Sequence, residues 1–249
     1  MAKTSDRRSG GGGTAAPSLR QPSLLAIPFL RLASSGPIEL LSDAQRQQVR
    51  QRATVRDYPA RTVVYRAGSP ADSVFIIGEG VVKSYRDLAS GRRRIAAFLF
   101  ARDLFGLAED GLYVNTVQTV TPVRAYELRV DALADLFAQY PDIEAQFLCK
   151  TVHVLREAQH HNIIMGRRDA VGRFAMLLQL LRKQDAAHIR RDIAMPMSKS
   201  DIANYLGLSL EAVVRASRRL ERQGIVEFVD RHQVRILDQS RFEAIAQAA

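Results

Sequence analysis

The stretch MSKSDIANYLGLSLEAVVRASRRLERQGIV, residues 197–226, decides the class of fold. Ser198 followed three residues later by Asp201 forms a capping box, which predicts the start of a helix. Gly207 ends that helix, and Ser209 caps a second one. Two helices joined by a glycine turn in about this length are typical of a helix-turn-helix. The segments IVEFV and VRIL, separated by the polar residues DRHQ, then predict the two short strands of a winged helix.

The second helix has an apolar face and a cationic face. Val213, Ala216 and Leu220 recur at spacings of three and four and are expected to face the core. An isolated charge run is usually a solvated face of a small helical domain. Here the cap, turn, second cap and strands follow in order, which favours double-stranded DNA as the partner. The residues expected to face outward are Glu211, Val214, Arg215, Arg218, Arg219 and Arg222.

These residues resemble the carboxy-terminal domain of the family of the cyclic AMP receptor protein and the fumarate and nitrate reduction regulator (CRP/FNR). The FixK-type branch is the nearest likeness, and it covers roughly residues 38–245. The resemblance implies a sequence-specific transcriptional regulator that binds a palindrome of TTG and CAA half-sites, with RNA polymerase as a partner. It also implies base readout by Leu210, Glu211, Val214 and Arg215, and phosphate contacts by Ser198, Lys199, Ser200, Ser209 and Arg218.

The chemistry of the two central readers fits that role. An arginine such as Arg215 can donate two hydrogen bonds to guanine, and a glutamate such as Glu211 can accept one from cytosine. One position departs from the family pattern, which has serine immediately before the reading arginine. Val214 stands there, and a valine can contact a thymine methyl group but cannot form a hydrogen bond.

Composition agrees with this interpretation. The 249 residues carry a net charge of +10, which favours a polyanionic partner. A single cysteine, Cys149, excludes a disulfide framework within the chain, and no signal peptide or membrane-spanning apolar run is evident. We therefore expect a cytoplasmic protein with no membrane partner. Residues 1–36 are rich in Gly, Ser and Arg, and we expect a disordered tail there.

Residues 37–132 contain short β-rich runs separated by turn residues, which predicts a compact β-roll. The predicted fold is therefore α+β. It consists of a jelly-roll domain that resembles cyclic-nucleotide-binding modules over residues 37–132, a dimerisation helix over 133–165, and a winged helix-turn-helix domain over 166–249.

The sensor-like domain lacks the residues that hold a cyclic nucleotide in the family. Nucleotide-binding relatives have a Gly-Glu-Leu segment and an Arg-Ser or Arg-Thr pair that clamps the phosphate. Here the corresponding segments are Phe105-Gly106-Leu107-Ala108 and Tyr113-Val114. A buried anion without a cation loses its charge-assisted hydrogen bonds. We therefore expect no cyclic nucleotide effector and no cofactor.

Haem is the alternative cofactor, because His153, His160 and His161 lie in one helical region. Cys149 is a possible redox switch, although a cysteine on a helix usually behaves as a small hydrophobic residue. An iron-sulfur cluster requires four cysteine ligands, and one chain supplies only one. We find no His-rich metal motif, nucleophile elbow or phosphate loop, so an enzyme is not expected.

A long helix is expected to begin near Pro141, which suits a first helical turn. Apolar residues then recur at spacings of three and four, as in a coiled-coil seam. A helix packed within its own domain is the alternative. We predict a homodimer, because one winged helix presents a single short DNA-binding surface and a two-fold dimer presents two. The predicted interface residues are Ile143, Phe147, Thr151, Val154, Ala158 and His161.

Overall fold

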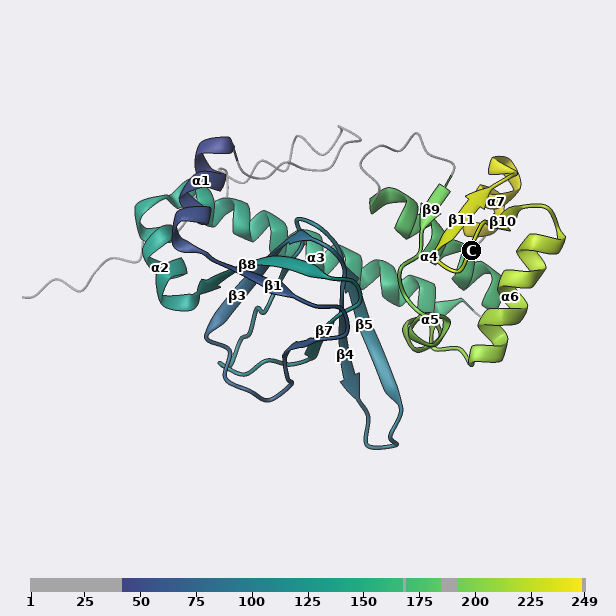
Figure 1. Ribbon diagram of the computed structural model, residues 1–249, viewed down its shortest axis with the longest axis horizontal. Helices are drawn as coiled ribbons and strands as arrows, with labels where there is room; N and C mark the ends of the chain where they lie inside the picture. The colour runs from purple at the N-terminus through teal and green to yellow at the C-terminus, as the bar shows by residue number, and fades with distance from the viewer. Residues whose placement is uncertain (1–41, 168, 185–191, 248–249) are drawn as a thin grey trace, which may run out of the picture. The chain divides into compact units, whose positions relative to one another are not determined.

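The computed structural model describes residues 42–167, 169–184 and 192–247, all of which fall within one compact unit, Gly36–Ala249 (Figure 1). The predicted disordered tail, residues 1–36, lies outside the described residues. No helix in the described part of the chain combines the length and the apolar character needed to cross a bilayer.

Two four-stranded antiparallel sheets form a β-roll, as the sequence predicts. One sheet has the order β1-β8-β3-β6, with β1 at Thr54–Tyr58, β8 at Val123–Arg129, β3 at Ser73–Glu79 and β6 at Leu104–Phe105. The other has the order β2-β7-β4-β5, with β2 at Val63–Tyr65, β7 at Thr116–Thr119, β4 at Val82–Asp87 and β5 at Arg93–Leu99.

Apolar side chains fill the interior of the roll. Because side chains alternate across a strand, each sheet places every second residue inside. The buried cluster comprises Phe75, Ile77, Val82, Phe105, Tyr113, Val117, Val123 and Ala125. The turn between β3 and β4 requires a glycine: Gly80 has φ +93°, and an added Cβ would overlap the carbonyl oxygen of Pro122.

Three helices cover the outer face of the first sheet. They are α1 (Asp43–Arg52), α2 (Val130–Gln139) and α3 (Pro141–Gly166). Tyr140 separates α2 from α3 with a non-helical backbone (φ −134°, ψ 79°), because the ring of Pro141 disfavours a helical residue before it. The sequence analysis did not predict α1, and it included most of α2 in the dimerisation helix.

The carboxy-terminal part forms a winged helix-turn-helix. It contains α4 (Ala170–Gln184), β9 (Asp192–Ala194), α5 (Lys199–Leu206), α6 (Leu210–Arg222), β10 (Val226–Phe228), β11 (Gln233–Ile236) and α7 (Gln239–Gln247). The predicted wing strands, β10 and β11, pair with each other, and β9 adds a third strand beside β11. Helices α4, α5, α6 and α7 bury a shared core that includes Phe174, Leu178, Leu206, Leu220 and Phe242. The predicted fold class is thus confirmed.

Candidate nucleic-acid interface

The helix-turn-helix is held by two serine caps and one glycine. The hydroxyl oxygen of Ser198 accepts a hydrogen bond from the backbone N–H of Asp201 at 3.1 Å. The hydroxyl oxygen of Ser209 accepts one from the backbone N–H of Ala212 at 3.1 Å. Between the helices, Gly207 adopts the left-handed conformation with φ +63°. These local interactions fix the start of α6 relative to the end of α5.

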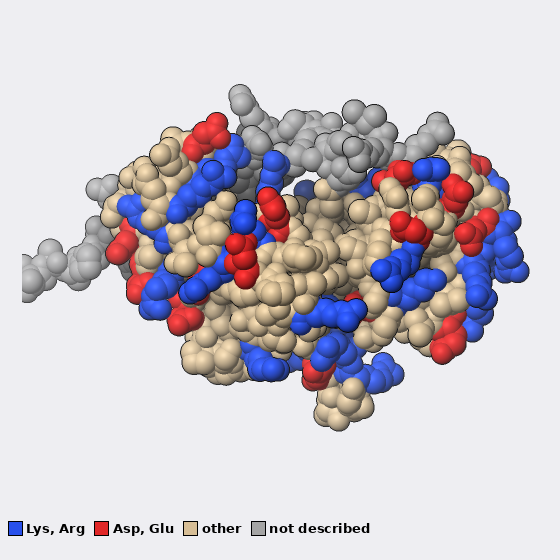
Figure 2. Space-filling view, in the orientation of Figure 1, with Lys and Arg blue, Asp and Glu red and all other residues tan. Residues whose placement is uncertain are grey.

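Helix α6 presents a charged surface opposite its buried face. Val213, Ala216, Ser217 and Leu220 are buried, whereas Glu211 and the arginines of the helix are exposed. None of Arg215, Arg218, Arg219 and Arg222 forms an ion pair with a residue in the described ranges. Lys and Arg side chains gather at the edge of the molecule where α6 lies (Figure 2). This edge therefore offers several guanidinium groups to an anionic partner.

The predicted base readers lie together at the start of α6. Leu210 is 45% exposed, Glu211 and Arg215 are exposed, and Val214 is half-buried. Hydrogen bonds from its own backbone N–H and from Ser209, together with the nearby charge of Arg215, lower the pKa of Glu211 below its usual value. Glu211 is therefore ionised at neutral pH and acts only as a hydrogen-bond acceptor.

The predicted phosphate contacts lie at the amino-terminal ends of the two helices. Ser198, Lys199 and Ser200 are exposed at the start of α5, and Ser209 is exposed at the start of α6. Backbone N–H groups and the helix dipole make such ends favourable for anions. The fifth predicted contact, Arg218, is exposed two turns along α6.

Contacts between the β-roll and α5 were missed by the sequence analysis. Lys83 of β4 donates to Asp201 of α5 at 2.6 Å, and both side chains are largely buried. The rings of Phe98 in β5 and Tyr205 in α5 lie 5.1 Å apart. Lys83 and Asp201 are 118 positions apart in the sequence, so no local pattern could have indicated the pair.

Helix α3 carries an exposed apolar stripe that differs from the predicted interface. Leu148 is 48% exposed, Val152 49%, Leu155 58% and Ile163 63%. Their spacings of four, three and eight place them on one side of a helix. These four are the large apolar side chains of α3 that the described residues leave exposed.

Two of the predicted interface residues make contacts within their own chain. Ile143 is fully buried among residues of its own chain, and His161 is 9% exposed. The ring of His161 stacks on Tyr205 at 4.1 Å, and its Nε2–H donates to the Tyr205 carbonyl at 2.9 Å. Both side chains are therefore largely covered by residues of their own chain. Periodicity alone could not show this, because both faces of α3 have apolar residues at spacings of three and four.

The other four predicted interface residues differ in their surroundings. Phe147 packs edge-on against Phe137 of α2, with ring centroids 5.1 Å apart. Val154 is half-buried and lines a pocket of its own chain. Thr151 and Ala158 are exposed and flank the apolar stripe. The predicted seam is thus rotated by about a third of a turn from the exposed stripe.

A pocket of about 280 Å³ lies between the roll and α3. Tyr113 helps to close it: the ring stacks on Tyr65 at 3.7 Å, and the hydroxyl donates to the Ser73 carbonyl at 2.7 Å. Burial raises the pKa of Tyr113, so the phenol stays protonated. Among the described residues that line this pocket there is no lysine or arginine, whereas the acids Asp103 and Glu157 are present. The described part of the lining therefore provides no lysine or arginine side chain for a phosphate.

Comparisons with known proteins agree with this architecture. Residues 55–140 match the family model for a cyclic nucleotide-binding domain, and residues 172–245 match the model for a Crp-like helix-turn-helix domain. The chain is 28% identical over 210 residues to the transcriptional activatory protein AadR of Rhodopseudomonas palustris, covering 84% of this chain and 87% of that protein. It is 29% identical over 174 residues to the nitrogen fixation regulation protein FixK of Azorhizobium caulinodans, covering 68% and 70% of the two chains.

A solved structure is also similar. The structure of FixK2 from Bradyrhizobium japonicum superimposes with a TM-score of 0.73 at 30% sequence identity, covering 79% of this chain and 98% of that one. The β-roll, the long helix and the winged helix-turn-helix therefore occur in the same order in a related protein. The two domain matches and the similarity to FixK2 show that the chain belongs to the CRP/FNR family of DNA-binding transcription regulators, in its FixK-type branch.

Proposed function

We propose that this chain acts as a homodimer that binds a palindromic DNA site, with a G·C pair in each half-site read by Arg215 and Glu211. One observation carries the proposal: these two side chains are exposed one helical turn apart on α6, whose opposite face is buried. Their donor and acceptor groups match guanine and cytosine in the major groove. By similarity to FixK-type regulators, the half-sites are expected to resemble TTG and CAA, and RNA polymerase is the expected protein partner.

The exposed stripe of α3 supports the dimer. Leu148, Val152, Leu155 and Ile163 form an apolar strip that a second copy of the same helix would cover. A two-fold axis along α3 would relate two α6 helices, as a palindrome requires. We therefore assign the dimer contact to this stripe instead of the face that carries Ile143 and His161.

Fluorescence anisotropy on a labelled palindrome and a random duplex tests the base readout. Arg215→Ala is expected to weaken specific binding by about 1–3 kcal/mol and to relax the preference at one base pair. Arg218→Ala is the matched control on the same helix. It is expected to weaken binding to both duplexes equally. It should also reduce the slope of log K against log salt concentration by about one, as expected for the loss of one phosphate contact. Equal losses on both duplexes for Arg215→Ala would refute its role as a base reader.

We further propose that this dimer binds DNA without a cyclic nucleotide. The absence of lysine and arginine from the described lining of the 280 Å³ pocket, and the stacking of Tyr113 on Tyr65, support this. A ligand shifts an equilibrium only through different affinities for the two states. Addition of millimolar cyclic AMP or cyclic GMP should therefore leave the affinity for the palindrome unchanged, and a tenfold increase would contradict the proposal.

Haem-dependent gas or nitric oxide sensing is the second candidate. The observation that favours it is that His153 lines the 280 Å³ pocket. His161 is less suited as a ligand, because its Nε2–H is already engaged by the Tyr205 carbonyl. The absorbance spectrum of the purified protein separates the two candidates: a Soret band that His153→Ala removes would select the haem sensor.

A further inference from the structure

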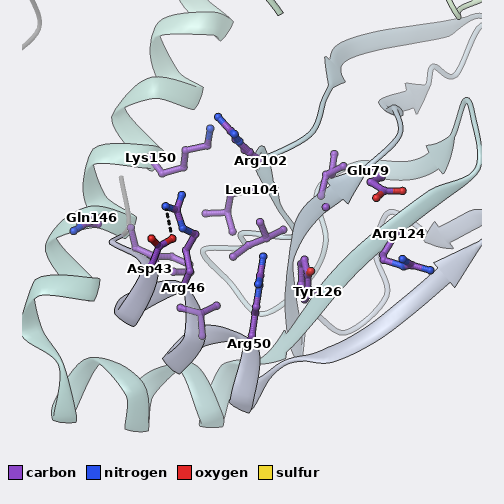
Figure 3. A pocket seen from close by; sticks show the side chains of 15 residues that line it. Asp43, Arg46, Arg50, Glu79, Arg102, Leu104, Arg124, Tyr126, Gln146 and Lys150 are labelled. Atoms are coloured by element: carbon purple, nitrogen blue, oxygen red, sulfur yellow. Dashed lines mark hydrogen bonds and ion pairs between the residues drawn. The ribbon is translucent and has the colours of Figure 1, made fainter. Parts of the chain in front are cut away.

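A second and larger cavity, of about 620 Å³, lies on the opposite side of the first sheet from the roll interior (Figure 3). It is bounded by α1, the outer faces of β3 and β8, the turn before β6, and the first turns of α3. The alternation of side chains along β3 separates the two spaces, because Ile76 faces this cavity whereas Phe75 belongs to the core of the roll. Its volume is within the range of sites for small organic ligands.

The charged residues that line this cavity are mostly cationic. Five basic side chains line it against two acidic ones, Asp43 and Glu79. Figure 3 shows Arg46 and Arg50 extending from α1, Lys150 from α3 and Arg102 from the turn before β6, whereas Arg124 lies apart from them on β8. Two of the basic residues are half-buried and three are exposed, so the site is open to solvent and its excess positive charge attracts an anion. The five basic residues are Arg46, Arg50, Arg102, Arg124 and Lys150.

Protein carboxylates already pair with some of these cations. Three of them form ion pairs: Arg46 with Asp43 at 2.9 Å, Arg124 with Asp57 at 2.8 Å, and Lys150 with Asp103 at 3.0 Å.

Arg50 differs from these three cations. Its guanidinium lies 5.7 Å from the ring centroid of Tyr126 and forms no ion pair with any residue that the structure describes. Arg50 is therefore the cation best placed to take a ligand carboxylate or phosphate.

The backbone of the turn before β6, at the edge of the cavity, also supports an anion site here. Arg102 has φ +74°, a left-handed conformation that is uncommon for residues other than glycine. Its N–H donates to the Ile77 carbonyl at 2.7 Å, which holds this turn against β3. A strained residue of this kind persists where the surrounding structure requires it. Here the turn carries a guanidinium to the cavity, as Figure 3 shows.

The floor of the cavity is apolar. Ile76 and Phe147 are half-buried and leave apolar surface in the cavity, and Val49 and Leu104 lie buried in the core next to them, each 4% exposed. An inorganic ion would leave the surface of Ile76 and Phe147 uncovered, whereas an aromatic or aliphatic body would cover it. We propose that this cavity binds a small organic anion, with an apolar body on the floor and a single carboxylate or phosphate group at Arg50.

Isothermal titration calorimetry on the full chain tests this inference with naphthyl phosphate, naphthoate and the neutral analogue naphthalenemethanol. The two anions are expected to bind, and their relative affinities distinguish the phosphate from the carboxylate head group. The neutral analogue is expected to bind at least tenfold more weakly, because it lacks the charge-assisted hydrogen bonds. Binding of the anions should also weaken as sodium chloride is raised.

Variants of α1 locate the site. Arg50→Gln is expected to weaken anion binding by about tenfold or more, and Arg50→Glu to abolish it. Arg52→Gln removes the same charge from the same helix but lies outside the cavity, where Arg52 contacts the Tyr140 ring and Gln139. This control should retain the parent affinity. Unfolding temperatures measured without ligand show that each variant is folded.

Three results would overturn the inference. One is the absence of anion binding at millimolar concentration. Another is equal binding of naphthalenemethanol and the anions, which would indicate a purely apolar site. The third is an unchanged affinity in Arg50→Glu, which would place the probe elsewhere, for example in the 280 Å³ pocket. None of these results depends on DNA, so the proposed transcriptional function is tested separately.

Discussion

Replacement of Leu155 by alanine tests whether the exposed stripe of α3 is the dimer contact. Leu155 is 58% exposed in the single chain. Complete burial of a leucine side chain contributes about 1.5–3 kcal/mol, so covering this fraction contributes about 0.9–1.7 kcal/mol per copy. A two-fold symmetric dimer carries the substitution in both copies, which gives about 1.7–3.5 kcal/mol per dimer. The Kd of the dimer should therefore rise roughly 15- to 300-fold.

Sedimentation equilibrium over a wide concentration range measures that Kd. The neighbouring variant Val154→Ala is the matched control, because Val154 is half-buried and lines a pocket within its own chain. It is expected to keep the dimer Kd of the parent and to lose only stability of the fold. If Val154→Ala weakens the dimer as much as Leu155→Ala, or if Leu155→Ala has no effect, the stripe is not the interface. A weaker dimer should also bind the palindrome less tightly, since each monomer contacts one half-site.

Three further predictions concern stability. Gly207→Ala should lower the free energy of unfolding by about 1–2 kcal/mol, measured by urea denaturation, because an alanine at φ +63° is strained. Burial lowers the pKa of His161 below the usual 6.5. The unfolded chain therefore takes up this proton first, and the free energy of unfolding should fall as pH falls below about 6.5; His161→Gln should weaken that dependence between pH 7.5 and 5.5. Lys83→Met should destabilise the fold by about 1–3 kcal/mol, because it leaves the largely buried Asp201 without its cation; the Lys83→Met/Asp201→Asn double variant should recover part of this loss.

Local signals made the winged helix-turn-helix predictable. Ser198 and Ser209 each accept a hydrogen bond from a backbone N–H three residues ahead, and Gly207 supplies a left-handed turn between them. Every one of these interactions joins residues close in sequence, so the pattern of residue types carries the information. The same holds for the β-roll, whose short apolar runs and turn residues indicated strands. Helices α1 and α7 and strand β9 were missed.

The exposed face of α3 could not be predicted from patterns of neighbouring residues. The predicted interface residues between Ile143 and His161 recur at spacings of three and four, and so do Leu148, Val152 and Leu155, so both sets match the period of an amphipathic helix. Which of the two sets is buried within the chain depends on the helices and strands that pack on α3. That packing buries Ile143 and His161 and leaves the other set exposed.

The sequence by itself therefore determined the family, the fold class and the residues of α6 that face outward, because caps, turns and helical period act over a few residues. Only the tertiary structure decided which side of α3 is exposed, how Lys83 meets Asp201, and that cations from α1, α3 and the turn before β6 surround one cavity. The physical reason is that burial and long-range ion pairs depend on neighbours distant in sequence. Those neighbours are brought together by the folding of the whole chain.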